Sequence, residues 1–328
     1  MKTVDMKDAL PSLRVEGATG HRNLTVVPCL GGRERYRDYL LACEAMEAGQ
    51  LRVTETSSSG TVPELLAYNL GHRPILLIDG EELQGAKQNR ILNTTVLLEP
   101  ASETRVPVSC VEEGRWSSVS GEFTTGHYAP GSLRSRKSLD VQRSLRVCGR
   151  PQSDQGAVWS CVSDEVAASG ASAPTRALAD ALNARAESVE RYHEALPYPS
   201  GACGVVAAVG GRFVAADVFD SPATLEVLWP RLIASYAVDA ERDDARSDKT
   251  FSAKAASVIL EYVAQQQADA FKTVGLGYDL RFETDQMIGQ GRIVEGCLLH
   301  LSVFPPTAER SVRDVEGPRI SPPSRRRR

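Results

Sequence analysis

The densest group of chemically capable side chains is the sequence DGEELQGAKQNR, residues 79–90. It mixes carboxylates, amides and cations, and it lies between two apolar runs that are typical of strands. A simple hairpin needs only about two to five connecting residues, while Gly80 and Gly85 permit tight turns or close backbone approach. The segment is therefore either a polar hairpin end or a site that recognises a polar ligand.

A second polar group, CVEEGRW, closes the strand expected at residues 104–111. In an antiparallel arrangement this strand returns toward the start of the strand expected at 91–98, which would bring Glu112, Arg115 and Trp116 near residues 87–90. Arg115 suits bidentate contact with a phosphate, and Trp116 suits stacking on a base or sugar. The alternative for Trp116 is an ordinary core aromatic, because tryptophans are highly buried on average.

A third group joins the basic stretch LRSRKSLDVQRSLR to SDQGAVW at residues 153–159. Its arginines and lysine suit phosphate, and Trp159 offers another stacking face. A charge run of this kind is also typical of a solvated helix face. Both interpretations stay open for this stretch.

Motifs of other familiar chemistries are absent from the sequence. The five histidines lack the spacing of metal ligands, and the seven scattered cysteines include no C-x-x-C pair. No P-loop, dinucleotide fingerprint or G-x-S-x-G elbow occurs. We therefore predict no dedicated metal site and no cofactor. A divalent cation held by Glu81, Glu82 or Glu112 stays open, since carboxylates and phosphate oxygens are the usual magnesium ligands.

The elements that would position the first two groups are short strands. Apolar runs separated by Gly, Asn, Ser or Pro recur about every ten residues up to residue 113, which is typical of an antiparallel sandwich or small barrel. Helical spacing over 33–48 precedes them. We predict a β-rich lobe over residues 20–118 that carries both polar segments.

The hydrophobic period changes near residue 174. Apolar residues from 178 to 196 recur every three or four positions, as in a helix. The pair Gly210-Gly211 predicts a hairpin, and Ser221-Pro222 predicts the start of a helix that Pro230 should kink. The chain is thus predicted to be α+β, with an N-terminal antiparallel sandwich or barrel-like lobe followed by a C-terminal lobe of helices on an antiparallel sheet.

The remaining divisions follow from composition. Residues 119–174 read as a basic, irregular connecting segment, and 175–303 as the α+β lobe. Residues 307–328 are rich in Pro, Arg and Ser and are predicted to be disordered. The N-terminus has no apolar stretch of a signal peptide, and no run of about 18 apolar residues occurs, so we expect a cytoplasmic protein. The formal net charge of −4 does not favour nucleic-acid binding.

Three motifs in this order, DGEELQGAKQNRILNTTVLL, VPVSCVEEGRW and SDQGAVW, carry a family resemblance. The chain resembles the ARG (ADP-ribosylglycohydrolase) and rhodanese-phosphatase-superfamily-associated protein domain family over residues 20–303. The family is named for the genes with which its members are associated. The resemblance implies a role in the metabolism of ADP-ribose or a related NAD-derived nucleotide.

ADP-ribose would need cations, amide donors and an aromatic face, and the three segments supply them. We predict binding of an ADP-ribose-like phosphorylated metabolite. In an enzyme, Glu82 or Glu112 would be the general acid or base, because burial and neighbours tune carboxylates toward neutral pH. Lys87, Arg90 and Arg115 would offset negative charge in the transition state. The predicted catalytic residues are Glu82, Lys87 and Glu112. The predicted ligand contacts are Gln88, Asn89, Arg90, Asn93, Arg115, Trp116, Arg136, Lys137, Asp154, Gln155 and Trp159.

Two other interpretations predict no turnover. In one, the protein is a non-catalytic metabolite sensor, or an adaptor working beside an ADP-ribosylglycohydrolase or a phosphatase. In the other, the polar hairpin is only a contact surface of a structural interaction protein. Ligand binding without turnover would favour the sensor over both the enzyme and the contact surface.

Overall fold

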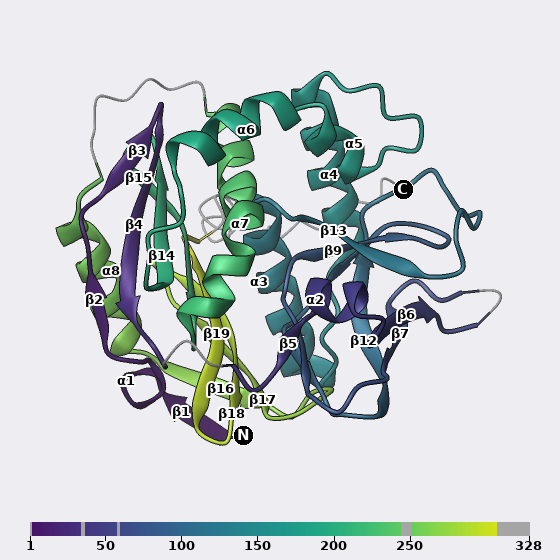
Figure 1. Cartoon of the computed structure of the whole chain (residues 1–328), viewed down its shortest axis with the longest axis horizontal. Helices are drawn as coiled ribbons and strands as arrows, with labels where there is room; N and C mark the ends of the chain where they lie inside the picture. The colour runs from purple at the N-terminus through teal and green to yellow at the C-terminus, as the bar shows by residue number, and fades with distance from the viewer. Residues whose placement is uncertain (1, 34–36, 58–59, 244–250, 307–328) are drawn as a thin grey trace, which may run out of the picture.

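The computed structural model describes residues 2–33, 37–57, 60–243 and 251–306. This part of the chain is a mixture of helices and largely antiparallel sheets, which confirms the predicted α+β class. Figure 1 shows a large sheet on one side, smaller sheets on the other, and long helices between them. The predicted disordered segment 307–328 lies outside the described residues.

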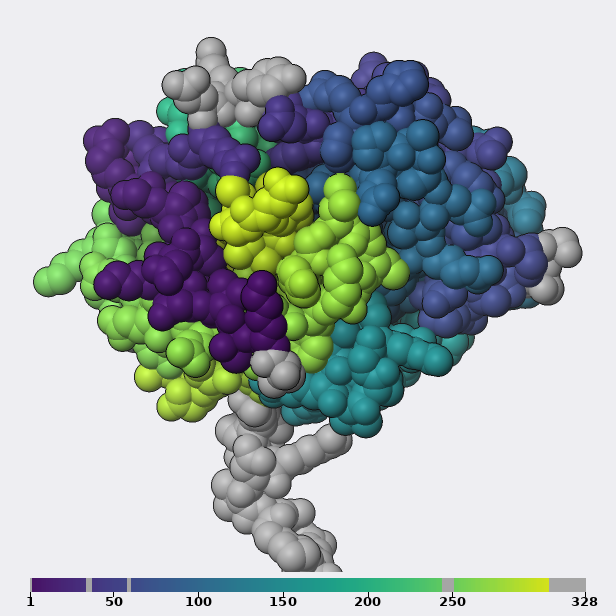
Figure 2. Space-filling view, turned by 90° about the horizontal axis from the view of Figure 1, so that it is seen from below, coloured from purple at the N-terminus to yellow at the C-terminus, as the bar shows by residue number. Residues whose placement is uncertain are grey.

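The large sheet is built from both ends of the chain. Its strands are β1 (Lys2–Asp5), β2 (Leu13–Val15), β3 (Thr19–His21), β4 (Leu24–Gly31), β14 (Ala202–Val209), β15 (Arg212–Phe219), β16 (Gln267–Phe271), β17 (Tyr278–Glu283), β18 (Ile288–Val294) and β19 (Cys297–Phe304). Strand β4 pairs with β14, and β1 pairs with β16. Figure 2 shows the N-terminal residues (purple) lying against the C-terminal strands (yellow and green). The sequence analysis assigned residues 20–31 to the N-terminal lobe, but they share a sheet with C-terminal strands. The boundaries of the predicted lobes stay a prediction.

A second group of strands forms two further sheets in the region for which the sequence predicted a sandwich or small barrel. One sheet contains β6 (Leu51–Glu55), β7 (Glu64–Asn69), β9 (Glu81–Gly85), β10 (Arg90–Leu92), β12 (Ser102–Cys110) and β13 (Phe123–Tyr128), and a small sheet contains β5 (Leu40–Leu41), β8 (Ile75–Leu77) and β11 (Val96–Leu98). Alternate residues such as Leu65, Ala67, Val106 and Val108 face the small sheet and share one apolar core with it. The pairings are antiparallel except for β5 with β8.

Residues 119–174 contain two helices, which corrects the prediction of an irregular segment. These are α3 (Gly131–Cys148) and α4 (Gln155–Ser169). Leu133, Lys137, Val141 and Leu145 follow each other every four residues, so Lys137 occupies one place in an otherwise apolar row. Both Arg134 and Lys137 are buried. The basic residues concealed the helical period because two of them face the core.

The other helices cover the sheets. They are α1 (Met6–Ala9), α2 (Ala42–Glu47), α5 (Leu178–Asn183), α6 (Ala186–Ala195), α7 (Pro222–Arg242) and α8 (Ala253–Ala264). The predicted hairpin is confirmed, with positive φ at Gly210 and Gly211 between β14 and β15. Ser221 caps α7 by accepting a hydrogen bond from the Ala223 amide (3.2 Å). Successive residues of β14 alternate between the α7 core and the α8 core, so the sheet is buried on both faces.

Candidate functional site

The β9–β10 hairpin places the two polar segments side by side. Arg90 pairs with Leu83 of β9 on one side and with Cys110 of β12 on the other. Residues 86–89 form the turn of the hairpin, and residues 112–117 continue from the end of β12 across it. We call residues 86–90, residues 112–117 and Glu55 together the hairpin site.

Arg115 holds the turn in place and uses all its donors to do so. Its Nε and Nη2 donate to the Glu112 carboxylate at 2.7 and 2.6 Å. Its Nη1 donates to the carbonyl oxygens of Ala86 (2.6 Å) and Ser117 (3.1 Å), and its Nη2 also lies 3.3 Å from Asn89 Oδ1. A guanidinium engaged in this way has no donor left for a phosphate. Its geometry therefore fits positioning rather than the predicted phosphate contact.

Glu112 is the counter-ion of Arg115. Its carboxylate also accepts the Asn89 amide (3.0 Å) and the Thr175 hydroxyl (2.8 Å). Burial alone raises the pKa of Glu112, but the hydrogen bonds from Arg115, the Asn89 amide and Thr175 outweigh it and hold the pKa below its usual value. Glu112 is thus charged, and both oxygens of its carboxylate accept hydrogen bonds.

Arg90, by contrast, is fully buried with an incomplete set of partners. Its Nη1 donates to the Gln88 side chain (2.9 Å) and main chain (3.2 Å). Among the described residues neither Nε nor Nη2 has a hydrogen-bond acceptor, and the Glu55 carboxylate lies 4.0 Å from Nη2. Burial lowers the pKa of Arg90. The guanidinium is a buried cation with donors to spare.

Trp116 covers the cations of the hairpin site. The Lys87 Nζ lies 5.4 Å from the centroid of the indole ring, and the Arg90 guanidinium carbon lies 5.7 Å from it. The residue is 48% exposed, so it is not the core aromatic that its type alone favours. One aromatic surface with two neighbouring cations is a suitable arrangement for a phosphate next to a planar ring.

Glu82 lies on the other face of the same sheet. It pairs with Ile91, whereas Arg90 pairs with Leu83, and neighbouring residues of a strand point to opposite faces. Its Oε2 accepts from Gln84 (2.8 Å) and from the His127 amide (3.2 Å), and within the described part of the chain its Oε1 has no partner. Burial raises the pKa of Glu82. The predicted acid or base and the predicted phosphate ligand are therefore on different faces.

The remaining predicted contacts are distributed between the two faces and α4. Gln88 Nε2 lies 3.5 Å from the Glu113 carbonyl, and Asn93 bonds the Pro151 carbonyl (3.2 Å). Gln155 holds the backbone of Cys110 with two bonds of 2.8 Å. Asp154 is exposed and caps α4, which is the local role of its motif.

Three predicted contacts lie away from the hairpin turn. Trp159 is half-buried within α4. Arg136 lies on α3 with its Nε 3.7 Å from the Asp140 carboxylate. Lys137 is buried and donates to Asp79, so it forms an ion pair in the protein interior and does not contribute to the hairpin site.

That interior is a charged network which sequence reasoning missed. Arg134 of α3 forms a bidentate pair with Asp217 of β15 (2.8 and 3.0 Å), and Ser302 donates to the same carboxylate (2.5 Å). Arg281 and Asp279 of β17 form another buried pair at 2.6 Å. Charged residues at inward positions of apolar strands, as in VAADVF and YDLRFE, were the available signal. We call these buried ion pairs, Arg134–Asp217 and Arg281–Asp279, the sealed network.

The described residues contain no group of three or more His, Cys, Asp and Glu side chains placed to hold a metal ion. Glu81 pairs with Arg231 (2.8 Å). In the ranges that the structure describes, every helix is too short or too polar to cross a membrane.

The fold and the site define an α+β protein with a cation-rich, partly open hairpin site. The sequence matches the model of the ARG and Rhodanese-Phosphatase-superfamily-associated Protein domain over residues 12–304. The chain belongs to this family. Comparison with curated proteins and with solved structures finds no match.

Proposed function

We propose that the chain binds an ADP-ribose-like phosphorylated nucleotide at the hairpin site. Arg90 and Lys87 would take the phosphates, and Trp116 would stack on the adenine. The observation that carries the proposal is the pair of buried Arg90 nitrogens that find no acceptor among the described residues. Leaving buried donors of a charged group unpaired costs more than about 1–3 kcal/mol, so an anionic ligand that supplies oxygens there would gain that free energy on binding.

Access to Arg90 would come from movement of Trp116. The ring is half-exposed and rests on the two cations, so it can shift without opening an apolar core. Arg115 and Glu112 would keep the turn in shape during this movement, because Arg115 donates to the Ala86 carbonyl and Glu112 accepts the Asn89 amide. We assign them to positioning, and Gln88 and Asn89 to the wall beside the ligand.

The family association supports the nucleotide. The name links these domains to ADP-ribosylglycohydrolases and to the rhodanese-phosphatase superfamily. ADP-ribose combines a diphosphate, two riboses and an adenine, and the hairpin site offers cations, amides and one indole face to such a molecule. A divalent cation stays a prediction, and would arrive with the diphosphate.

A thermal-shift and calorimetric titration with ADP-ribose, NAD and ribose 5-phosphate tests the proposal. A ligand at a hundred times its dissociation constant adds about 2.7 kcal/mol to stability. Lys87→Ala and Trp116→Ala should each weaken ADP-ribose binding by about tenfold, which is the range expected for a cation–π or stacking contact. Arg52→Ala is the matched control, because Arg52 is an exposed arginine on the Tyr68 ring (4.8 Å) in β6. Equal effects of the three variants would contradict the proposal.

A second candidate function is hydrolysis of the same nucleotide, and Glu82 favours it. A buried carboxyl suits a general acid or base when its pKa is raised and one oxygen, as here among the described residues, has no partner. The ligand would have to extend around the hairpin edge from Arg90 to the Glu82 face. Glu82→Gln should then keep ADP-ribose affinity and lose turnover.

Lack of turnover in the wild type would leave the sensor or adaptor form of the proposal. In that form the protein would bind the nucleotide beside an ADP-ribosylglycohydrolase or a phosphatase. Glu82→Gln would then change neither affinity nor any rate. Chromatographic analysis of ADP-ribose after incubation with the wild-type protein separates the two forms.

A further inference from the structure

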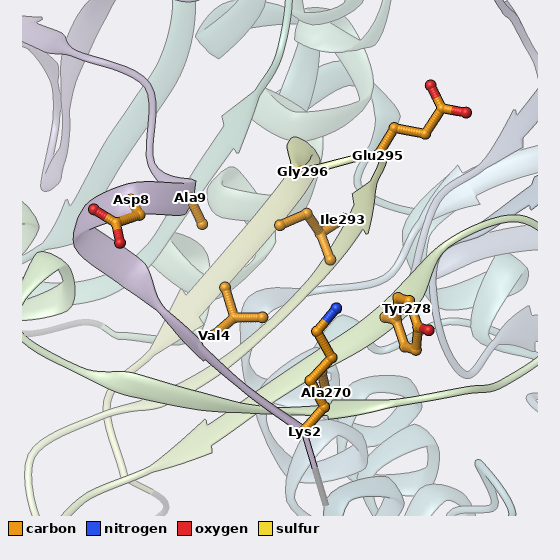
Figure 3. Close-up of a pocket in the computed structure, with 9 residues that line it drawn as sticks. All are labelled: Lys2, Val4, Asp8, Ala9, Ala270, Tyr278, Ile293, Glu295 and Gly296. Atoms are coloured by element: carbon orange, nitrogen blue, oxygen red, sulfur yellow. The ribbon is translucent and has the colours of Figure 1, made fainter.

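Two surface grooves lie away from the hairpin site. The one in Figure 3 has a volume of about 310 Å³ and is lined mainly by apolar residues such as Val4 and Ile293, with Lys2 directed toward the Tyr278 ring. The other has a volume of about 460 Å³, and its walls come from the start of β7 and the residue before it, from β12, from the α3–α4 loop and from the segment after β16. Small-molecule sites typically have volumes of about 300–1,000 Å³. We call the second one the basic groove.

The basic groove gathers cations from separate parts of the chain. Arg105, Arg150 and Lys272 line it, together with a single carboxylate, Glu64. Glu64 lies 3.5 Å from Arg105, and both side chains are largely exposed, so this pair is weak. Lys272 donates to the Gly277 carbonyl (3.3 Å). Among the described residues, no carboxylate lies within ion-pair distance of Arg150.

Polar bonds hold the walls of the basic groove in place. Asn93 donates to the Pro151 carbonyl, and the hydroxyls of Ser109 and Ser153 lie 2.5 Å apart. Gln155 fixes the start of α4 to Cys110. A loop tied to β10 and β12 in this way is already shaped before a ligand arrives, which reduces the entropy lost on binding.

We propose that the basic groove is a second ligand site, which takes the phosphate group of a small molecule. The guanidinium groups of Arg150 and Arg105 match the oxygens of a phosphate in size and geometry. The competing explanation is structural. Arg150 follows the C-terminus of α3, where a cation offsets the partial negative charge of the helix end.

Calorimetric titration with inorganic pyrophosphate at constant ionic strength tests the proposal. The full chain carrying Arg90→Met is used, so that the hairpin site does not contribute. Addition of Arg150→Glu should weaken pyrophosphate binding at least about tenfold, whereas Arg143→Glu should change it less than about twofold. Arg143 is the matched control, because it is an exposed arginine of α3 that does not line the groove.

Three outcomes would overturn the proposal. One is the absence of saturable pyrophosphate binding to the Arg90→Met protein. Another is equal weakening by Arg150→Glu and Arg143→Glu, which would indicate nothing more than the overall charge. The last is a lower melting temperature of Arg150→Glu with unchanged pyrophosphate affinity, which is the result for a cation that serves only the helix end. None of these outcomes depends on whether ADP-ribose binds at the hairpin site.

Discussion

Arg90 and Arg134 are both fully buried and both lie on aromatic rings, yet their pKa values are shifted in opposite directions. Arg134 receives a bidentate carboxylate from Asp217, which outweighs burial and raises its pKa. In the part of the chain that the structure describes, no carboxylate is hydrogen-bonded to Arg90, and burial lowers its pKa. Burial and residue type do not separate a structural cation from a receptive one. The difference is whether a carboxylate is hydrogen-bonded to the guanidinium. Asp217 bonds Arg134 in this way, whereas Glu55 lies 4.0 Å from Arg90 Nη2.

Removing the counter-ion from the sealed network should have the largest effect. Asp217→Asn leaves the Arg134 charge buried and unpaired, and we expect a loss of about 3–5 kcal/mol in the free energy of unfolding. The double variant Arg134→Met with Asp217→Leu should recover most of that loss, because it removes both charges. Urea denaturation of the three proteins measures this. A loss below about 1 kcal/mol for Asp217→Asn would mean that the network is not tightly sealed.

Asp239 is a buried carboxylate that forms no ion pair among the described residues, and it gives the next largest effect. Asp239 of α7 accepts the Gly131 amide at the start of α3 (2.7 Å), and burial raises its pKa from 3.8 to about 6. The folded state therefore holds this proton more tightly than the unfolded state does. Its contribution to stability should fall by on the order of 2–3 kcal/mol as the pH rises from about 4 to about 6.

Asp239→Asn isolates this contribution. The variant should lack this component of the pH dependence, so the difference in unfolding free energy between the variant and the wild type should change across that interval. Asp217 contributes in the opposite direction, because Arg134 and His300 outweigh burial and hold its pKa below the usual value. Unfolding curves at several pH values, compared between the two proteins, provide the measurement. A constant difference would refute the assignment.

The smallest effect on stability is expected at the hairpin site, from substitution of the exposed Trp116. Trp116 is 48% exposed, and its contacts with Lys87 and Arg90 are cation–π contacts. Trp116→Ala should reduce the unfolding free energy by about 1 kcal/mol or less, while it weakens ADP-ribose binding. Thermal denaturation without ligand checks the first part. A loss of several kcal/mol would make Trp116 a core residue.

The sequence was sufficient to predict that the two polar segments lie side by side at the hairpin site. It was not sufficient to predict which of their side chains share a face of the sheet. Two polar segments at the ends of adjacent antiparallel strands must meet, and Arg90 indeed pairs with Cys110. Whether Glu82 and Arg90 share a face depends on the register between β9 and β10, which a one-residue shift would invert. That register follows from the turn at 86–89, whose conformation includes a positive φ at Ala86. No pattern in the sequence specifies it.

Long-range pairing explains the other differences from the sequence predictions. Strand β4 is apolar and unmistakable, but its partner β14 lies about half the chain away, and hydrophobic period carries no information on partners. Lys137 and Arg134 suggested a solvated or ligand-binding surface because their counter-ions lie far away in the sequence, Asp79 in the turn before β9 and Asp217 on β15. A buried ion pair is recognisable only when both members are known.

The most direct test of the comparison is Arg90→Met, measured for stability and for ligand binding together. Methionine keeps much of the volume and removes a charge that has no hydrogen-bonded carboxylate, so the free energy of unfolding should stay within about 1 kcal/mol of the wild type or increase. ADP-ribose binding should be lost in the same protein. The contrary result is a loss of about 3–5 kcal/mol, as expected for Arg134→Met, together with unchanged ADP-ribose affinity. It would show that Arg90, like Arg134, is a structural cation.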